Sequence, residues 1–156
     1  MILVVSDSHR FVKNLNQVVE SYAPKLLAVL HLGDVTDDIY PLRLLYPALQ
    51  FYCVSGNSDA GSKEPLWRVV ELGGKKIFMT HGHEYAVKSG YRKIEAEAVS
   101  HNADICLFGH THEPVQFNKG GIIFMNPGSI SLPRSERSPS YGILDIEQQL
   151  YNIEGI

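Results

Sequence analysis

Apolar runs recur along the chain, and five of them stop at a short polar turn. Short runs rich in apolar residues and bounded by Gly, Asp, Asn or Ser are typical of strands that are buried on both faces. The five runs are residues 1–5, 26–32, 51–54, 75–80 and 104–108. The hydrophobic pattern therefore predicts a core built largely from strands, with polar residues gathered where the strands end.

Helical spacing separates the first three runs. Apolar residues recur every three to four positions over 14–22, and Pro24 closes this predicted helix. A second helix is predicted over about 38–45, with Asp37 or Asp38 as its N-cap. The order strand–helix–strand–helix–strand implies parallel strands joined by right-handed crossovers. In such sheets ligands bind beyond the carboxyl ends of the strands, where the polar turns lie.

The second half of the chain shows hairpin signals instead. The further predicted elements are a hairpin of strands 66–72 and 75–80 around Gly73-Gly74, a helix over 91–101, a hairpin of strands 115–117 and 122–125, a tight loop over 126–129, a polar, mobile loop over 135–139, and closing antiparallel strands over 141–146 and 150–153. The early strands read as parallel and the later ones as antiparallel. We therefore predict an α/β fold of two packed, mixed β-sheets flanked by helices, with residues 1–156 in a single domain.

The last of the five polar turns contains two histidines, His110 and His112, separated by one residue. On an extended chain, positions i and i+2 point to the same side, so both imidazoles leave the strand end together. Imidazole is the commonest metal ligand among protein side chains, and the pair supplies half of a metal site. The other turns also carry residues of ligand type: Asp7-x-His9, Gly33-Asp34, Gly56-Asn57-x-Asp59 and His81-Gly82-His83.

Each turn alone also fits an ordinary structural role. An Asp after a Gly is usually a turn residue or a helix cap, and an Asn in Gly-Asn-Ser-Asp is usually a turn former. A histidine after a strand is more often a surface or core residue than a ligand. Five such turns in one order are much harder to explain by chance, so we interpret them as one metal-binding constellation.

The ordered set resembles the signature of the calcineurin-like metallophosphoesterases, D-x-H … GD … GN[H/x]D … H … GHxH. It is most similar to the small, single-domain bacterial and archaeal phosphodiesterases of that superfamily. The match runs from Asp7 to His112, and the stretches 126–129 and 133–134 also fit the subfamily. The resemblance implies two divalent metal ions. One would be held by Asp7, His9, Asp34 and His112, and the other by Asp34, Asn57, His81 and His110, with the Asp34 carboxylate as the bridge.

The chemistry of these donors supports the assignment. A shared carboxylate lets two cations approach to roughly 3.5–4 Å, the spacing of two-metal hydrolytic sites. The mixed nitrogen and oxygen ligands favour manganese, with nickel, iron or zinc as alternatives, over calcium. Two such ions against the carboxylates of Asp7 and Asp34 leave a net charge of about +2, which suits a small phosphodiester substrate. The expected reaction is in-line attack of a metal-bound hydroxide on phosphorus, without a protein nucleophile.

Ser58 departs from the family pattern, because many members carry a histidine there that is thought to help protonate the leaving group. A serine hydroxyl is a poor general acid at neutral pH. His83 is a candidate replacement, and a structural role for His83 is an equal alternative. The predicted catalytic residues are Asp34, Asn57 and His83, and the predicted residues that orient ligands are Asp59 and the loop 126–129.

Composition and charge narrow the class of protein. Contents of 44% hydrophobic and 20% charged residues are typical of a globular protein, and no apolar stretch approaches the roughly 20 residues that span a membrane. Cys53 and Cys106 lie inside apolar runs, and Met1 leads directly into a strand, so we expect reduced core cysteines and a cytoplasmic location. A net charge of −3 argues against a broad nucleic-acid-binding face.

A non-catalytic, metal-binding scaffold is the alternative function, because the retromer complex contains a subunit of this fold that acts as a binding platform. The complete set of predicted ligands counts against it. A nuclease like the larger DNA-repair members lacks support, because the chain shows neither a capping domain nor a basic stripe. The natural substrate, the physiological metal and assembly into a homo-oligomer stay open at this point.

Overall fold

The computed structural model describes residues 1–134 and 136–156, whose strands form two five-stranded sheets. The first sheet contains β1 (Ile2–Val5), β2 (Ala28–His31), β3 (Gln50–Cys53), β9 (Ser140–Asp145) and β10 (Leu150–Gly155). The second contains β4 (Trp67–Leu72), β5 (Lys75–Thr80), β6 (Ile105–Leu107), β7 (Pro114–Lys119) and β8 (Ile122–Pro127). The helices are α1 (Val12–Tyr22), α2 (Tyr40–Leu45) and α3 (Arg92–Ser100), with short 3-10 helices η1 (Ala23–Lys25), η2 (Thr36–Ile39) and η3 (His83–Tyr85).

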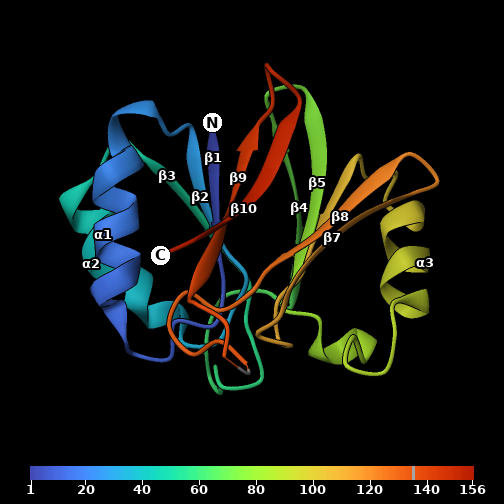
Figure 1. Ribbon diagram of the computed structural model, residues 1–156, viewed down its shortest axis with the longest axis horizontal. Coiled ribbons are helices and arrows are strands. Elements are labelled where there is room, and N and C mark those ends of the chain that lie inside the picture. Colours follow the sequence, from blue (N-terminus) through green and yellow to red (C-terminus); the bar gives the residue numbers. More distant parts are fainter. Residues whose placement is uncertain (135) are drawn as a thin grey trace.

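The two sheets face each other between two outer layers of helix (Figure 1). In that view α1 and α2 cover the outer side of the first sheet, and α3 covers the outer side of the second. The predicted α/β fold, with two mixed sheets flanked by helices, is confirmed.

The first sheet has the strand order β10-β9-β1-β2-β3, and β1, β2 and β3 run parallel. The connections through α1 and through η2 and α2 carry the chain from each strand to its parallel neighbour. Leu15, Val18 and Val19 form the buried face of α1, as their helical spacing predicted. The carboxyl ends of the three strands therefore meet at one edge of this sheet.

The second sheet has the order β4-β5-β6-β8-β7. Its three central strands, β5, β6 and β8, run parallel, and each edge strand is antiparallel to its neighbour. The predicted antiparallel hairpins, β4 with β5 and β7 with β8, are confirmed, but the parallel run of β5, β6 and β8 differs from the prediction that the later strands are antiparallel. The predicted closing pair of antiparallel strands is confirmed as β9 and β10, and it lies in the first sheet, where β9 pairs with β1. Pairing between segments so distant in sequence leaves no local hydrophobic pattern from which to predict it.

The core explains why the strands are apolar on both faces. Ile2 and Val4 of β1 meet Ile77 and Met79 of β5 in the layer between the sheets. The alternate residues point outward, and Leu3 packs with the residues that face it from α1. On the other side of the molecule, Phe78 and Cys106 pack under α3. Both faces of the central strands are therefore buried, as their uninterrupted apolar runs indicate.

The second helix and the loop after β8 differ from their predictions. The segment predicted as a helix over 38–45 begins as the 3-10 helix η2 and becomes α-helical at Tyr40. Neither Asp37 nor Asp38 caps α2, whose N-cap is Ile39 without a side-chain hydrogen bond. Asp38 instead accepts hydrogen bonds from residues of the turn after β1. The predicted tight loop over 126–129 is shorter, because β8 continues through Pro127.

Three smaller predictions concern cysteines, a loop and membrane crossing. Cys53 and Cys106 are buried and free, as predicted. Of the loop predicted over 135–139, Ser135 lies outside the described residues. A membrane-crossing helix needs about 20 apolar residues, and in the described ranges every helix falls short in length or hydropathy.

Candidate metal centre

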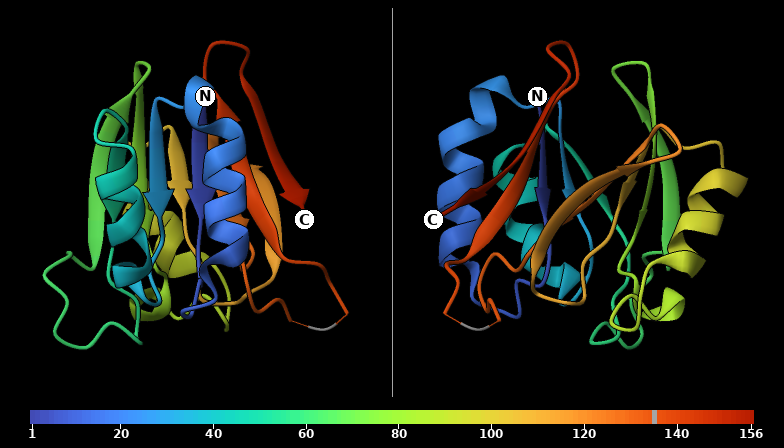
Figure 2. Two further views of the ribbon diagram at one scale, coloured as in Figure 1. Left: turned by 90° about the vertical axis from the view of Figure 1, so that its left-hand side faces the viewer. Right: turned by 45° about the vertical axis from the view of Figure 1, so that its right-hand side comes forward.

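The polar turns of both sheets gather at one end of the molecule. The turns that follow β1, β2 and β6 lie at the lower end of both views in Figure 2. Asp7 and His9 follow β1, Asp34 follows β2 and Asn57 follows β3. From the second sheet, His81 follows β5, and His110 and His112 follow β6. All seven predicted ligands therefore extend from strand ends that come together between the two sheets.

The backbone at these turns is held in an unusual conformation. The φ angles of Asp7, His9, Asp34, His110 and His112 are 57°, 47°, 60°, 69° and 59°. This left-handed region is costly for residues with a Cβ atom, and it persists only where the surrounding structure enforces it. Such residues cluster at functional sites, and here five of them are the candidate ligands themselves.

The glycines of the turns provide space for close approach. A Cβ atom on Gly56 would lie 2.2 Å from Asp34 Oδ1, and one on Gly109 would lie 2.0 Å from Ser6 Oγ. Any larger residue would push Asp34 or the Asp7 strand end away from its place. The Gly-Asn and Gly-His pairs of the sequence are therefore a steric requirement of the site.

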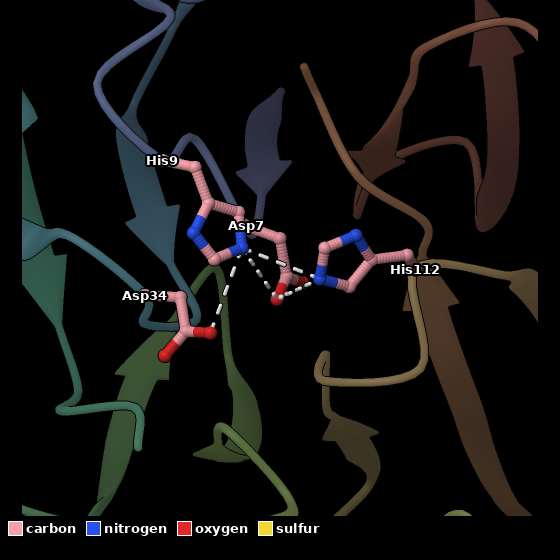
Figure 3. A group of neighbouring side chains, drawn as sticks. All are labelled: Asp7, His9, Asp34 and His112. Carbon is pink, nitrogen blue, oxygen red and sulfur yellow. Dashed lines mark hydrogen bonds and ion pairs between the residues drawn. The ribbon is translucent and has the colours of Figure 1, made fainter. Parts of the chain in front are cut away.

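The first group of ligands is Asp7, His9, Asp34 and His112, whose ligand atoms all lie within 4.8 Å of one another (Figure 3). His9 Nε2 lies 3.3 Å from His112 Nε2 and 3.6 Å from Asp34 Oδ2. His112 Nε2 lies 3.2 Å from Asp7 Oδ1. Two imidazoles and two carboxylates thus converge on one small volume.

The second group forms around His81. Its Nε2 atom lies 3.2 Å from Asn57 Oδ1, 3.2 Å from His110 Nδ1 and 3.5 Å from Asp34 Oδ1. Asp34 therefore belongs to both groups, with Oδ1 toward His81 and Oδ2 toward His9. The structure brings together all seven side chains that the sequence singled out as ligands.

Backbone carbonyls fix the orientation of two of the rings. His81 Nδ1 lies 2.8 Å from the carbonyl of Leu32, and His112 Nδ1 lies 2.5 Å from that of Leu132. A carbonyl only accepts, so each Nδ1 carries the proton and each Nε2 is directed into the site. This arrangement is the usual support of a metal-binding histidine.

A cation fits this arrangement of atoms. Asp7 Oδ1 is buried, and within the described residues its one possible donor is His112 Nε2 at 3.2 Å, which donates only when that ring is protonated. Asn57 Oδ1 and Asp34 Oδ1 face the Nε2 atom of His81, which has a lone pair when the ring is neutral. Acceptor atoms that face one another repel unless a proton or a metal ion lies between them. A divalent ion would satisfy these acceptors together.

The surroundings shift the pKa values of three candidate ligands, His110, Asp7 and His112. Burial lowers the pKa of His110 to about 4, and nearby His81 adds to the effect. Burial raises the pKa of Asp7, but the hydrogen bond with His112 and the charges of His81 and His112 outweigh it, and the net shift is downward. The hydrogen bond with Asp7 raises the pKa of His112 above its usual 6.5, against the effect of burial. The raised pKa favours the protonated ring of His112, and a metal ion bound there would have to displace that proton.

Asp59 holds two of the ligand-bearing turns together, as predicted. One of its carboxylate oxygens accepts from the backbone N–H groups of Asp34 at 2.9 Å and Gly56 at 2.7 Å, and the other accepts from that of Thr36 at 2.8 Å. The Ser58 N–H in turn donates to Asp34 Oδ1 at 2.9 Å. These bonds fix the bridging carboxylate against the turn that carries Asn57.

The stretch 126–129 orients the other turns, again as predicted. Asn126 Nδ2 donates to the carbonyl of Gly109 at 2.8 Å, and its Oδ1 accepts from the Gly128 N–H at 2.9 Å. Ser129 Oγ donates to the carbonyl of Asp7 at 2.8 Å. Both side chains are fully buried, so they tie the turn after β6 and the turn after β1 to the end of β8.

A buried network that the sequence analysis missed supports the turn with His9. His31 Nδ1 accepts from the Gly33 N–H at 3.2 Å, so its Nε2 carries the proton toward Ser8 Oγ at 3.1 Å. Ser8 Oγ donates to Asp38 Oδ2 at 2.7 Å, which also accepts from the Arg10 N–H at 2.8 Å. Burial lowers the pKa of His31 to about 4, which keeps the ring neutral. The sequence feature that could have indicated this network is His31, a histidine inside the apolar run 26–32.

The ligands open into a hollow of about 510 Å³, which Ser58, Lys88 and Arg134 also line. His83 is not among the described residues that line this hollow. Its ring centroid lies 5.4 Å from that of His81, and its Nε2 lies 3.3 Å from Glu84 Oε1. Burial and nearby His81 lower the pKa of His83. A neutral ring outside the hollow is poorly suited to donate a proton.

Comparison with known proteins places the chain among metallophosphoesterases. The model of the calcineurin-like phosphoesterase superfamily domain matches residues 1–149. The probable metallophosphoesterase YsnB of Bacillus subtilis is 33% identical, covering 94% of this chain and 84% of that protein. Phosphodiesterase YfcE of Escherichia coli is 32% identical over 83% of this chain and 64% of its own length. Vacuolar protein sorting-associated protein 29 (Vps29) of Schizosaccharomyces pombe is 28% identical, covering 94% of this chain and 85% of that protein.

Solved structures give the same result. A predicted phosphoesterase from Streptococcus pneumoniae is 35% identical with a TM-score of 0.77, covering 90% of this chain and 79% of that one. An archaeal phosphodiesterase superposes with a TM-score of 0.81 over 99% of both chains, at 24% identity, and so shares the fold. With the family model matched over nearly its whole length, this chain belongs to the calcineurin-like phosphoesterase superfamily.

Proposed function

We propose that this protein is a phosphodiesterase that uses two divalent metal ions to hydrolyse a small phosphodiester. The Asp34 carboxylate is the observation that carries the proposal, because one of its oxygens faces His9 at 3.6 Å and the other faces His81 at 3.5 Å. A carboxylate placed between two groups of ligands supports a pair of ions that share it.

The ligand sets follow from the two groups of side chains. Asp7, His9, Asp34 and His112 would hold one ion, and Asp34, Asn57, His81 and His110 would hold the other. Nitrogen and oxygen donors together suit manganese first, with nickel, iron or zinc as alternatives. When bound, such a pair lowers the pKa of a water molecule and neutralises charge on the phosphoryl oxygens.

The chain's own side chains would bind and orient the substrate. Lys88 and Arg134 line the same hollow as the ligands, and their charges attract an anionic phosphate and hold its non-reacting oxygens. Hydrolysis joins a water oxygen to phosphorus, breaks one P–O ester bond and leaves a proton on the departing alcohol. Asp59 and Asn126 take no part in this step. Their hydrogen bonds hold the ligand-bearing turns in place.

The proton for the leaving oxygen has no evident donor at the Ser58 position. Ser58 lines the hollow but has only a hydroxyl to offer. His83, predicted as a catalytic residue, does not line this hollow among the described residues, its ring centroid lies 5.4 Å from that of His81, and its pKa is lowered. We propose that the leaving oxygen departs with much of its negative charge, so that acidic leaving groups react fastest.

Metal content and hydrolysis measured on one preparation test the proposal. Elemental analysis after saturation with Mn²⁺ should find two ions per chain, and bis(4-nitrophenyl) phosphate should be hydrolysed. A chelator should abolish turnover, and returned Mn²⁺ should restore it. The exposed Asp37→Asn variant serves as a control for handling and should match the wild type in metal content. At most one bound ion at saturation would rule out the two-ion site.

The alternative function is a non-catalytic, metal-binding scaffold, which the similarity to Vps29 supports. Leu44 and Leu45 of α2 are 66% and 67% exposed, and clustered apolar surface is typical of protein contacts. A screen of phosphodiesters and monoesters with Mn²⁺, Ni²⁺, Fe²⁺ and Zn²⁺ separates the two functions. Metal binding without turnover of any substrate would favour the scaffold.

A further inference from the structure

A second hollow, of about 450 Å³, lies beside the one that contains the metal ligands. The segment from Thr36 to Arg43 forms one wall, and the loop from Ser58 to Glu64 forms the other. We call it the Tyr40 groove after the aromatic residue in the first wall. Its volume is in the range that holds a drug-sized molecule.

We call the hollow of about 510 Å³ that the metal ligands line the metal hollow. Ser58 joins the Tyr40 groove to the metal hollow, because it lines both. Its N–H donates to Asp34 Oδ1 at 2.9 Å, which fixes the peptide beside the bridging carboxylate. Its side chain is small and exposed. A phosphodiester bound in the hollow of the metal ligands can therefore direct one of its ester groups past Ser58 and into the groove.

The formal charges of the side chains that line the Tyr40 groove sum to zero. The cations that line it are Arg10, Arg43 and Lys63, and the anions are Asp37, Asp59 and Glu64. Arg43 is paired with Glu64 at 3.0 Å, and Asp59 is occupied by backbone N–H groups. The groove thus differs from the metal hollow, where Lys88 and Arg134 favour an anion. Its lining suits an uncharged, hydrogen-bonding group better than a second phosphate.

Tyr40 gives the groove a flat apolar surface among polar neighbours. Tyr40 is 63% exposed at the start of α2, and Thr36, Asp37 and Ser62 line the same groove with hydroxyl and carboxylate groups. An exposed aromatic ring is a stacking platform for a nucleobase, and the polar neighbours can bind the hydroxyls of a sugar. We propose that the Tyr40 groove binds the nucleoside group of a nucleoside phosphodiester. This inference rests on the proposed function, which supplies the phosphate position.

Two chromogenic diesters with one leaving group test the inference. Thymidine 5′-(4-nitrophenyl phosphate) and methyl 4-nitrophenyl phosphate both release nitrophenolate, and only the first has a nucleoside. The Mn²⁺-loaded protein should hydrolyse the thymidine diester with a kcat/KM at least about tenfold higher. Tyr40→Ala should remove this preference and leave the methyl diester unaffected. Tyr40→Phe should keep the preference, because the ring remains, and Leu44→Ala provides an exposed control on the same helix.

Calorimetric titration with thymidine 5′-monophosphate and methyl phosphate gives a readout independent of turnover. The nucleotide should bind at least about tenfold more tightly, and Tyr40→Ala should abolish the difference. Equal hydrolysis of both diesters would overturn the nucleoside subsite and leave the phosphodiesterase proposal intact. If neither diester is hydrolysed, the proposed function fails, and the titration alone decides whether Tyr40 binds a nucleoside. Binding that does not depend on Tyr40 would overturn the inference.

Discussion

Among single residues, Asp34 connects the two groups of ligands, with Oδ1 toward His81 and Oδ2 toward His9. We expect Asp34→Asn to weaken both metal sites by about 100-fold or more, because the amide removes a charge and one acceptor oxygen. His112→Ala should mainly weaken one site. Metal titration followed by elemental analysis would measure both effects, with Asp37→Asn as the isosteric control. Full occupancy of two sites in Asp34→Asn would contradict the shared carboxylate.

The raised pKa of His112 predicts that metal affinity depends on pH. The hydrogen bond with Asp7 favours the protonated ring, so in the metal-free protein His112 loses its proton only above its usual 6.5. As the pH falls below that raised pKa, the metal must displace a proton, and its affinity should fall by up to about tenfold per pH unit. Calorimetry in buffers of different ionisation enthalpy should detect proton release near pH 7. The His112→Gln variant should release fewer protons when it binds metal. Equal proton release from the variant and the wild type would show that another group holds the proton.

Because Ser58 stands where many family members have a histidine, we expect the rate to depend on the acidity of the leaving group. Without a strong acid, the wild-type kcat/KM should rise steeply as the leaving group becomes more acidic. Ser58→His should speed alkyl diesters more than nitrophenyl diesters, because a positioned acid contributes about 10²–10⁴-fold and helps poor leaving groups most. His83→Ala should leave the slope unchanged. Diesters of graded leaving-group pKa would give the slopes, and a loss confined to alkyl diesters in His83→Ala would instead assign proton delivery to His83.

At the level of elements, the turn after β3 depends on the absence of a side chain at Gly56. Its backbone φ is not in the left-handed region, but an added Cβ would lie 2.2 Å from Asp34 Oδ1 and 2.5 Å from Asp34 N. We expect Gly56→Ala to displace the bridging carboxylate, lower metal affinity at both sites and destabilise the fold by about 1–3 kcal/mol. Denaturant unfolding and metal titration would measure the two effects.

Gly155→Ala is the matched control for that substitution. Gly155 is also outside the left-handed region, and its added Cβ would meet only atoms at 3.9 Å. Its metal affinity should be that of the wild type, and its stability should change by less than about 1 kcal/mol. A Gly56→Ala variant with normal metal affinity would show that the turn after β3 can move without disturbing Asp34.

The turns that carry the ligands could be predicted from the sequence because their chemistry is local. A residue such as Asp34 directly follows an apolar run, and parallel strands place such residues at one edge. The path of the later strands could not be predicted, because β9 pairs with β1 across almost the whole chain. The role of Asp38 could not be predicted either. Asp38 was expected to cap a helix, but it accepts hydrogen bonds from Ser8 and Arg10. The ligands could thus be predicted from local sequence patterns. The hydrogen bonds that support them could not, because they join segments that are distant in the sequence.

At the scale of the whole molecule, the candidate metal centre lies where the two sheets meet. Asp7, His9, Asp34 and Asn57 follow strands of the first sheet, whereas His81, His110 and His112 follow strands of the second. Ions bound by both sets would join the sheets at this end. Because the unfolded chain cannot gather these ligands, metal binding should stabilise the native state alone.

Removal of metal should therefore lower the melting temperature. An ion present at 100 times its Kd contributes about 2.7 kcal/mol, which corresponds to about 5–10 °C in a protein of this size. Calorimetric scans of the Mn²⁺-saturated and chelator-treated protein would measure the shift. Asp34→Asn should melt at one temperature with or without chelator, because it has lost the residue common to both ligand sets. If wild-type protein loses its ions without any change in melting temperature, the metal ions do not hold the two sheets together.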